Sequence, residues 1–308
     1  MPSDPAPQNK ARAEIVPVVA VDTDGRFARL DFGSPTLGER ALAGQFFEVS
    51  CRAQDGGGSQ GGSLLTPLLN RPFSLHRWID GGFSILFEVV GLGTQRLAAL
   101  RASQRVLVIG PLGRGMQEIP AGITRLVLVA GGTGIAAFPA FAQLSARRDV
   151  RCWLYYGVNT GADVAFRREG SASQPSLLLD EFDALGCRWS LASMHDRSFF
   201  PGTVVDLLER DRREGREPFE KSHKEILLIG CGPRAMLRAL AVWSAERNLR
   251  CYLLLEEMMG CGFGICRSCA VPGFQITEDG KKIRRNLAVC RDGPMIEAER
   301  IDWEMDWS

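Results

Sequence analysis

Residues 126–135 read Leu-Val-Leu-Val-Ala-Gly-Gly-Thr-Gly-Ile and carry the clearest fold signal of the chain. The leucine and valine run predicts a buried strand, and the glycines after it predict a tight turn. Residues 135–146 continue without a charge and predict a buried helix. The uncharged segment 126–146 is about long enough to cross a bilayer. Its glycines and Pro139 nevertheless favour strand, turn and helix over a membrane span.

The same alternation of strands and helices continues toward the C-terminus. Strands are expected at Arg125–Ala130, Cys152–Tyr156, Cys187–Ala192, Glu225–Ile229 and Cys251–Leu255. Helices are expected at Ile135–Ala146, Val204–Arg213 and Ala235–Arg247. This rhythm is typical of an α/β domain with a doubly wound parallel sheet, which we assign to residues 121–255. Beyond Glu256 the chain turns irregular and Gly-rich, so residues 256–308 are expected to form a small separate module.

The N-terminal third of the chain predicts a different architecture. Its candidate strands are Ala13–Val21, Phe27–Phe32, Gln45–Cys51, Phe73–Trp78, Phe83–Val90 and Arg105–Ile109. Their spacing favours an antiparallel β-barrel domain over residues 13–120. The Gly- and Ser-rich residues 53–67 are expected to be a surface-loop insertion, and the Pro-rich residues 1–12 a disordered tail.

Composition and charge exclude several classes of protein. The 308-residue chain carries 37 Lys and Arg against 36 Asp and Glu, with no basic block. This balance argues against a nucleic-acid partner or an anionic membrane surface. Nine cysteines are an odd number, and the N-terminus lacks the apolar segment of a secretory leader. Free or metal-bound thiols in a reducing cytoplasm are therefore expected.

Four of the nine cysteines form a metal-binding pattern. Cys261, Cys266 and Cys269 are spaced C-x4-C-x2-C, and Cys290 follows at a distance. This is the plant-type spacing for a [2Fe–2S] cluster, which is held by four thiolates. Glycines between the cysteines would let a short loop wrap the cluster. A structural zinc ion and unligated thiols are the alternatives, although zinc sites usually show paired C-x2-C knuckles.

Two glycine turns predict a nucleotide-binding crevice. The first comprises Gly131, Gly132, Thr133, Gly134 and Ile135, and the second comprises Gly230, Cys231, Gly232 and Pro233. Backbone N–H groups at such turns can hold a pyrophosphate, and nucleotides bind in crevices at the carboxyl ends of parallel strands. Either turn taken alone could instead be a tight strand-to-helix connection that binds nothing.

Two short segments of the barrel suit a phosphate and an aromatic ring. Arg71-Pro72-Phe73-Ser74 combines a cation, an aromatic face and a hydroxyl group. Gly91-Leu92-Gly93-Thr94 is a small-residue turn before the helix-like segment 94–100, a possible phosphate cradle. A solvated surface arginine is the alternative for Arg71.

Together these motifs resemble the ferredoxin–NADP reductase superfamily. In chain order they are R-P-F-S, G-x-G-T, G-G-T-G-I-A, G-C-G-P and E-E-x-M-G-C-G-x-G-x-C-x-x-C. Within that superfamily, a cluster module placed after the nucleotide domain is similar to the electron-transfer subunit of class B dihydroorotate dehydrogenase. The resemblance covers residues 13–300, and its most specific parts are residues 256–261 and 289–294.

The resemblance implies FAD in the barrel, a [2Fe–2S] cluster in the C-terminal module, and NAD(H) or NADP(H) in the α/β domain. The residues implied to hold FAD are Arg71, Pro72, Phe73, Ser74, Leu86, Phe87, Glu88, Gly93 and Thr94. The two glycine turns would form the nicotinamide dinucleotide crevice. Cys231 would face the nicotinamide, with a small buried thiol as the alternative.

This cofactor set implies an electron-transfer subunit. A nicotinamide exchanges two electrons as a hydride and the cluster exchanges one, so the flavin, which can do both, must lie between them. The implied partner is the FMN-containing catalytic subunit of dihydroorotate dehydrogenase, in a heterotetramer serving pyrimidine biosynthesis. Because no general base is needed, His76, His195 and His223 are expected to be ordinary polar residues. His76, near the flavin strand, is the strongest exception.

Other functions remain compatible with the sequence. The same cofactors would serve an NAD(P)H:ferredoxin oxidoreductase, a sulfide dehydrogenase or a hydrogenase diaphorase subunit. A non-enzymatic redox or iron sensor is disfavoured by the neutral charge. Residues 193–202 depart from the family's Thr-Asp-Asp-Gly-like stretch, and twenty residues separate Cys269 from Cys290. No basic pair directly follows the second α/β strand at residues 156–163, although Arg167-Arg168 stands further on, so NADH is favoured over NADPH.

Overall fold

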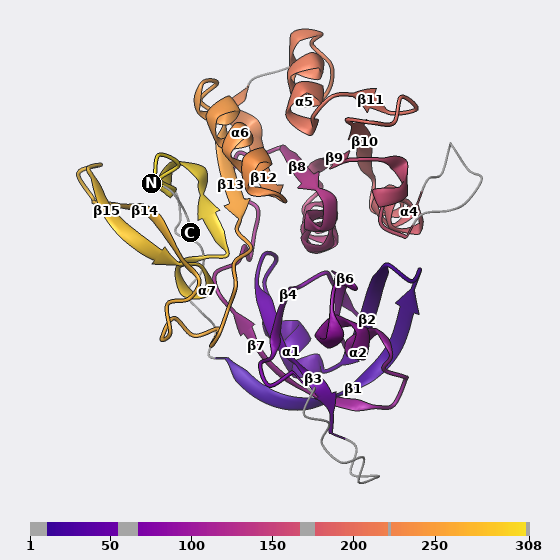
Figure 1. Cartoon of the computed structure of the whole chain (residues 1–308). Coiled ribbons are helices and arrows are strands. Elements are labelled where there is room, and N and C mark those ends of the chain that lie inside the picture. The colour runs from indigo at the N-terminus through magenta and orange to yellow at the C-terminus, as the bar shows by residue number, and fades with distance from the viewer. Residues whose placement is uncertain (1–10, 55–66, 167–175, 221–222, 306–308) are drawn as a thin grey trace.

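The computed structural model describes residues 11–54, 67–166, 176–220 and 223–305. A β-barrel and an α/β domain lie at opposite ends of the molecule, and the C-terminal module lies beside both (Figure 1). The multidomain β plus α/β fold class expected from the sequence is confirmed. Within the described residues, no helix is long and apolar enough to span a membrane.

The barrel is a seven-stranded antiparallel sheet in the order β4-β3-β7-β1-β2-β6-β5. Its strands are β1 (Arg12–Thr23), β2 (Phe27–Gly33), β3 (Phe46–Ala53), β4 (Arg71–Ser74), β5 (Arg77–Ile79), β6 (Gly82–Glu88) and β7 (Arg105–Leu112). Short helices α1 (Pro35–Arg40) and α2 (Leu92–Ala98) connect them. The first strand begins at Arg12, inside the segment expected to be a disordered tail. Residues 1–10 of that tail, and residues 55–66 of the expected loop insertion, lie outside the described residues.

The single strand expected at Phe73–Trp78 is wrong, because the chain crosses there between the two edges of the sheet. The Leu75 N–H donates to the Gln45 carbonyl at 2.8 Å, beside β3. The next residue, His76, donates its N–H to the Ser84 carbonyl of β6 at 2.9 Å. This two-residue step separates β4 from β5 and brings the ends of the sheet together as a barrel. An apolar pattern alone does not reveal which edge each residue pairs with.

The α/β domain is a second sheet in the order β11-β10-β9-β8-β12-β13-β16. Its strands are β8 (Arg125–Gly131), β9 (Arg151–Val158), β10 (Cys187–Ser193), β11 (Phe200–Pro201), β12 (Ile226–Cys231), β13 (Arg250–Leu254) and β16 (Met295–Glu297). All pair in parallel except β16, which is antiparallel to β13. Every residue of β8 is buried, as expected for a central strand covered on both faces.

Helices cover both faces of this sheet. The helices are α3 (Phe138–Arg147), α4 (Leu177–Ala184), α5 (Val204–Arg213) and α6 (Arg234–Ala245). Leu126 and Leu128 of β8 face the core shared with α3, α4 and the barrel. Val127 and Val129 face the core shared with α5, α6 and the C-terminal module. The one helix expected over Ile135–Ala146 begins instead as a 3₁₀ helix, Gly132–Ala137, and becomes α3 where Pro139 occupies the first turn.

The C-terminal module is more regular than the sequence predicted. Strands β14 (Ala270–Ile276) and β15 (Lys282–Ala288) form an antiparallel hairpin, followed by the short helix α7 (Val289–Asp292). The first five residues of β15 are exposed and mostly polar, so the alternating signal of a half-buried strand is missing. The module then returns β16 to the edge of the α/β sheet. The cysteine region is thereby attached to the nucleotide domain through a shared sheet.

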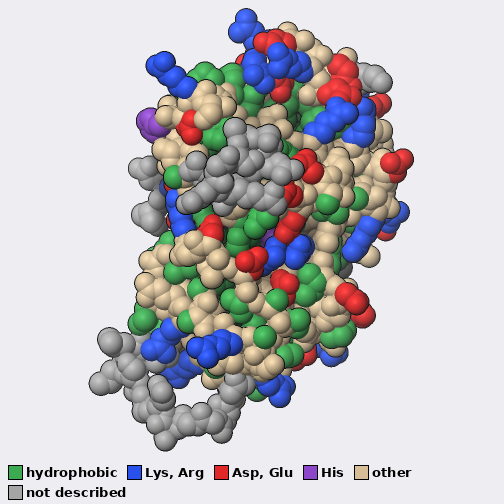
Figure 2. Space-filling view, turned by 90° about the vertical axis from the view of Figure 1, so that its right-hand side faces the viewer, with side chains coloured by type: hydrophobic (Ala, Val, Ile, Leu, Met, Phe, Trp, Pro, Cys, Tyr) green, Lys and Arg blue, Asp and Glu red, His purple; other side chains and the backbone are tan. Residues whose placement is uncertain are grey.

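Backbone contacts join the three parts. The Arg114 N–H, just after β7, donates to the Gly293 carbonyl at 2.5 Å, and the Leu255 N–H donates to the Pro294 carbonyl at 3.0 Å. On another face, Glu181 of α4 pairs with both Arg29 and Arg77 of the barrel. Figure 2 shows acidic and basic side chains mixed where the two lobes meet on this face.

The two glycine turns lie in direct backbone contact. A Cβ added at Gly134 would lie 2.2 Å from the Cys231 carbonyl oxygen and 2.8 Å from the Gly232 nitrogen. A Cβ at Gly232, where φ is +151°, would lie 2.8 Å from the Gly131 Cα. Only glycine therefore allows the ends of β8 and β12 to approach this closely.

Replacing Gly134 by alanine should destabilise the protein by roughly 3 kcal/mol or more, because the added methyl group meets backbone that cannot rotate away. Gly132→Ala is the matched control in the same turn. Its Cβ would meet nothing within 4 Å, and only its φ of +52° is unfavourable, which costs about 1 kcal/mol. Denaturant unfolding of both variants measures the difference, and equal losses would contradict the close contact.

Candidate functional site

Seven of the nine residues expected to hold a flavin line one cavity of about 550 Å³, whereas Arg71 and Gly93 are not among its lining residues. Its walls come from the barrel, from the glycine turn after β8 and from the segment that leads into the C-terminal module. The expected residues that line it are Pro72, Phe73, Ser74, Leu86, Phe87, Glu88 and Thr94. The remaining lining residues include Thr133, Ala136, Leu255, Glu256, Glu257, Met258, Met259 and Pro294. All three parts of the molecule therefore meet at this cavity.

The local geometry of the cavity suits a planar ring with a phosphate tail. The Phe73 and Phe87 rings lie 4.9 Å apart between centroids, one on β4 and one on β6. Arg71 lies beside Gly93, whose missing Cβ would be 3.3 Å from the arginine Nε. Thr94 accepts hydrogen bonds from the backbone N–H groups of residues 90 and 91 through its hydroxyl, at 2.9 and 3.1 Å. An apolar face and a cation beside a small-residue turn are features that FAD requires.

The first glycine turn borders a second cavity, which continues from the flavin cavity between the barrel and the α/β domain. Gly131, Gly132, Thr133 and Pro233 line it, and Glu88 and Thr133 line both cavities. The other expected residues do not line this cavity and lie within the two glycine turns themselves: Gly134, Ile135, Gly230, Cys231 and Gly232. The ends of β9 and β10 and the start of α5 complete the crevice. A dinucleotide lying over the turn would point one end into the flavin cavity.

The Cys231 thiol lies behind this junction and is fully buried. Its Sγ is 3.6 Å from Oε1 of Glu256, whose carboxyl group lines the flavin cavity. Enclosure by protein raises the pKa of Glu256, and burial raises the pKa of Cys231 well above its ordinary value. The sequence placed Glu256 in a family-specific motif and singled out Cys231, but it did not predict their contact, which joins residues 25 positions apart and leaves no local pattern.

The four cysteines of the C-terminal module form two sulfur pairs. Cys269 and Cys290 lie 3.2 Å apart between sulfur atoms, and Cys261 hydrogen-bonds the sulfur of Cys266. Two thiolates on each of two irons is the ligand arrangement of a [2Fe–2S] cluster, so these residues fit that group. The Gly264 N–H donates to the Cys290 Sγ at 3.1 Å, as expected for a loop that stabilises thiolate sulfur.

The loop between the cysteines also has the geometry that a tight wrap needs. Gly262 and Gly264 have φ of +74° and +80°, in the left-handed region that favours glycine. The hydrogen bond from the Ser268 hydroxyl lowers the pKa of Cys266 to about 6. Three apolar side chains in and next to this loop are exposed, Met258, Phe263 and Ile265, and we refer to them as the cluster rim. Met258 is 85% and Ile265 82% exposed.

A buried carboxyl group joins the barrel to the cysteine loop. Glu48 of β3 is 4% exposed, and a Cβ at Gly262 would lie 3.0 Å from its Oε1. That oxygen has no hydrogen-bond partner among the described residues. Burial raises the pKa of Glu48 to about 7, against the opposing charge of Arg71. Sequence reasoning missed this residue, because a glutamate in a strand gives no sign of its depth.

Neither His76 nor His195 lines either cavity. His76 is fully buried, and its Nδ1 lies 2.7 Å from the Ala136 carbonyl oxygen. Burial lowers the pKa of His76 to about 3, so the ring is neutral and serves the packing of barrel against turn. His195 is exposed, and the His223 side chain and Arg167-Arg168 lie outside the described residues.

A barrel with a flavin-sized cavity, a dinucleotide crevice and a four-cysteine module define a flavin- and iron–sulfur-dependent oxidoreductase of the ferredoxin reductase type. Two family models match the chain. The iron–sulfur cluster binding domain of dihydroorotate dehydrogenase B matches residues 256–302, and the oxidoreductase NAD-binding domain matches residues 128–241. Together they cover the crevice and the cysteine module.

Curated relatives give the family. The electron transfer subunit of dihydroorotate dehydrogenase B (NAD(+)) of Desulforamulus reducens is 30% identical over 89% of this chain and 92% of its own length. That of Bacillus caldolyticus is 34% identical over 76% of this chain and 80% of its own. The chain therefore belongs to the family of dihydroorotate dehydrogenase B electron transfer subunits.

Solved structures share the fold. An NADH-dependent reduced ferredoxin–NADP oxidoreductase matches with a TM-score of 0.69 and 20% identity, over 94% of this chain and 91% of the other. A ferredoxin NADP⁺ reductase from Neisseria gonorrhoeae with bound FAD and NADP matches with a TM-score of 0.56 and 15% identity, over 78% of this chain and 92% of the other. The expected FAD, NAD and [2Fe–2S] cofactor set is confirmed at the level of the family.

The raised pKa of Glu48 predicts a pH-dependent stability. The pKa of Glu48 in the folded protein, about 7, exceeds its ordinary value of 4.5. The stability contributed by the neutral carboxyl group is therefore fully present below about pH 4.5, and it is lost as the pH rises through about 7. Glu48→Gln stays neutral and should exceed the wild type by up to about 3 kcal/mol near pH 8 and by much less near pH 5.

Thermal unfolding of the holoprotein at both pH values measures this difference. Glu39→Gln, on the exposed side of α1, should show no pH-dependent gain over the wild type. A gain for Glu48→Gln that is equal at the two pH values would show that the buried carboxyl group ionises normally.

Proposed function

We propose that this chain carries electrons between NAD(H) and the catalytic subunit of dihydroorotate dehydrogenase, through FAD and a [2Fe–2S] cluster. One observation carries the proposal: a single cavity is lined by the barrel, by the dinucleotide turn and by the segment entering the cysteine loop. A group bound there would touch the nicotinamide on one side and lie next to the cluster module on the other. The named relatives supply the substrate, dihydroorotate, and the acceptor, NAD⁺.

The chain's own residues bind and orient the carriers. When bound, FAD supplies the exchange between a two-electron hydride and single electrons. Phe73 and Phe87 offer the apolar wall against which its ring would pack, and Arg71 and Thr94 stand at the phosphate end. Glu88 accepts a hydrogen bond from the Thr133 hydroxyl at 3.0 Å, which fixes the dinucleotide turn against the flavin strand.

Cys231 and Glu256 are in contact next to the place where the nicotinamide and flavin rings would meet. With its raised pKa, the Cys231 sulfur stays a neutral thiol and adds no charge beside the ring. Glu256 lines the cavity, and desolvation raises the pKa of its carboxyl group. Neither residue has to transfer a proton, because the cofactors carry the redox chemistry.

The cluster rim is the proposed docking surface for the catalytic subunit. Met258, Phe263 and Ile265 lie on the segment that carries Cys261 and Cys266, the two more accessible cysteines, and are unusually exposed for their type. Placing the cluster at this rim would let electrons leave or enter the chain there.

We also propose that the protein works in the cytoplasm. None of the nine cysteines forms a disulfide bond. A reducing compartment keeps such thiols free and preserves the cluster ligands.

Reconstitution with an FMN-containing dihydroorotate dehydrogenase catalytic subunit from the same genome tests the function. Under anaerobic conditions, orotate and NADH should form in equal amounts from dihydroorotate and NAD⁺ only when both subunits are present. The chain alone should still reduce ferricyanide with NADH. A complex that reduces ferredoxin but not NAD⁺ with dihydroorotate would contradict the proposal and favour the ferredoxin-linked activity of the structural relative.

Ile265→Asp sharpens this test at the cluster rim. Charging the rim should lower the dihydroorotate-linked rate at least tenfold and leave the NADH–ferricyanide rate unchanged. Val242→Asp, at a half-exposed apolar position on α6, is the control and should change neither rate. Equal effects of the two substitutions would remove the rim as the docking surface.

A further inference from the structure

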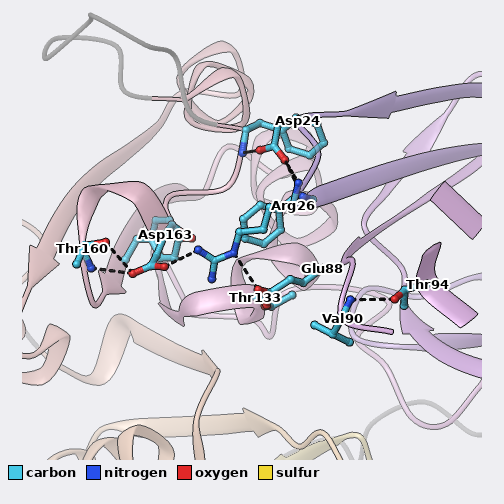
Figure 3. A network of polar contacts seen from close by, with 11 residues as sticks. Asp24, Arg26, Glu88, Val90, Thr94, Thr133, Thr160 and Asp163 are labelled. Atoms are coloured by element: carbon cyan, nitrogen blue, oxygen red, sulfur yellow. Dashed lines mark hydrogen bonds and ion pairs between the residues drawn. The ribbon is translucent and has the colours of Figure 1, made fainter. Parts of the chain in front are cut away.

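Several carboxyl groups at the contacts between domains are paired with arginines. Glu88 of the barrel and Asp163 of the α/β domain share Arg26, whose Nε lies 2.9 Å from the Glu88 Oε1 (Figure 3). Glu181 of α4 lies between two arginines of the barrel. Glu48 differs from all of these. It is buried between the barrel and the cysteine loop, and its Oε1 has no hydrogen-bond partner among the described residues.

Strand β3 places Glu48 between the flavin cavity and the cysteine loop. Phe46, two residues earlier on the same face of the strand, lines the flavin cavity. Pro72, the residue of β4 that pairs with Glu48, lines the same cavity. On the other side, the Glu48 Oε1 lies 3.0 Å from the position that a Cβ of Gly262 would occupy. Because Gly262 directly follows the expected cluster ligand Cys261, the carboxyl group stands beside the path from flavin to cluster.

The surroundings of Glu48 offer little to offset its charge. Among the described residues, Arg71 of β4 is the charged side chain whose field acts on it. Leu112 of β7 and Gly262, which meet beside the carboxyl group, are uncharged, and Arg96 of α2 acts on a cysteine of the opposite face of β3. The titratable groups of the adjoining loop are the cluster ligands themselves. A buried polar atom without a partner is uncommon enough in a folded protein to require an explanation.

The charge state of Glu48 changes within the range of pH that can be measured. Burial outweighs the attraction of Arg71 and raises the pKa of Glu48 to about 7. At pH 8 most of these side chains therefore carry a negative charge that is enclosed by protein rather than water. At pH 5.5 nearly all of them are neutral.

A negative charge at this place acts on the cysteine module. Reduction of an iron–sulfur cluster adds one electron, and a nearby carboxylate disfavours the added charge, most strongly where water is excluded. The net charge around such a cluster is one of the factors that set its reduction potential. A lower potential favours passage of the electron from the cluster to FAD. This is the direction of the proposed function, in which electrons from dihydroorotate reach NAD⁺.

We propose that Glu48 is a positioning residue for electron transfer, whose carboxylate holds a negative charge against the cysteine loop and lowers the reduction potential of the cluster. This inference rests on the proposed function and deepens it. In the step concerned, the reduced cluster loses one electron and FAD gains it. Glu48 exchanges no electron and forms no bond, and it only takes a proton from water when the pH falls.

Potentiometric titration of the holoprotein, followed by low-temperature EPR, measures the potential without turnover. In Glu48→Gln at pH 8, the equilibrium constant for reduction of the cluster should rise at least tenfold over the wild type, which is about 59 mV for one electron. At pH 5.5 the two potentials should agree, because the wild-type carboxyl group is then neutral. Glu48→Asp keeps the charge and should stay closer to the wild type at pH 8.

Glu181→Gln is the matched control. It removes a carboxylate from a different contact between domains and should leave the potential of the cluster unchanged at both pH values. A shift as large as that of Glu48→Gln would show that the loss of any interdomain carboxylate is enough, and would overturn the inference.

Three further results would also overturn the inference. They are a Glu48→Gln potential equal to that of the wild type at pH 8, a shift of the same size at both pH values, and a Glu48→Asp potential equal to that of Glu48→Gln. The second of these would mark a merely structural effect on the loop. If Glu48→Gln fails to assemble a cluster, the wild type decides, because its own potential should be higher at pH 5.5 than at pH 8. A wild type that binds no [2Fe–2S] cluster would instead overturn the proposed function.

Discussion

The shared wall of the flavin cavity is the constraint on which the rest of the structure depends. Three separately recognisable parts of the chain must meet there, because electron carriers held by different parts have to lie side by side. Two backbone hydrogen bonds hold the meeting point, from Arg114 to Gly293 and from Leu255 to Pro294. Strand β16 then ties the cysteine module to the same sheet that carries the dinucleotide turn. The cofactor order thus follows from chain connectivity and backbone pairing.

Close approach of glycines is the second requirement of this arrangement. The turns after β8 and β12 touch through backbone atoms at Gly134 and Cys231, which places the crevice at the carboxyl ends of two neighbouring parallel strands. A glycine also allows close approach in the cysteine loop. A Cβ at Gly262 would lie 3.0 Å from the Glu48 Oε1. Side chains at these positions would separate the carriers that the fold brings together.

Sequence reasoning worked where a local pattern determines the structure. The strand at residues 125–131 is recognisable from an unbroken apolar run, and α5 occupies the expected Val204–Arg213 because Thr203 and Asp206 form a capping box. The cysteine spacing indicated the cluster for the same reason. The hairpin β14–β15 escaped notice because β15 is exposed and polar.

The contacts that could not be predicted are those between distant residues. Arg26 meets Glu88 and Asp163 across 62 and 137 positions, and the burial of Glu48 depends on a loop more than 200 residues away. A side chain's sequence neighbours say nothing of such partners. Seven of the nine residues expected to hold FAD line one cavity, and four of the nine expected to hold NAD line the other. The contacts of the charged groups in those cavities emerge only from the three-dimensional arrangement.

An anaerobic titration of the purified chain with NADH, followed by visible absorption and low-temperature EPR, tests whether electrons pass from the nicotinamide through FAD to the cluster. The flavin absorption should bleach, and a rhombic signal of a reduced [2Fe–2S] cluster should then appear in the same sample. Such a result would establish a path from nicotinamide through FAD to the cluster within one chain. A chain that binds zinc and no flavin, or a flavin that bleaches while the cluster stays oxidised although dithionite reduces it, would contradict the account.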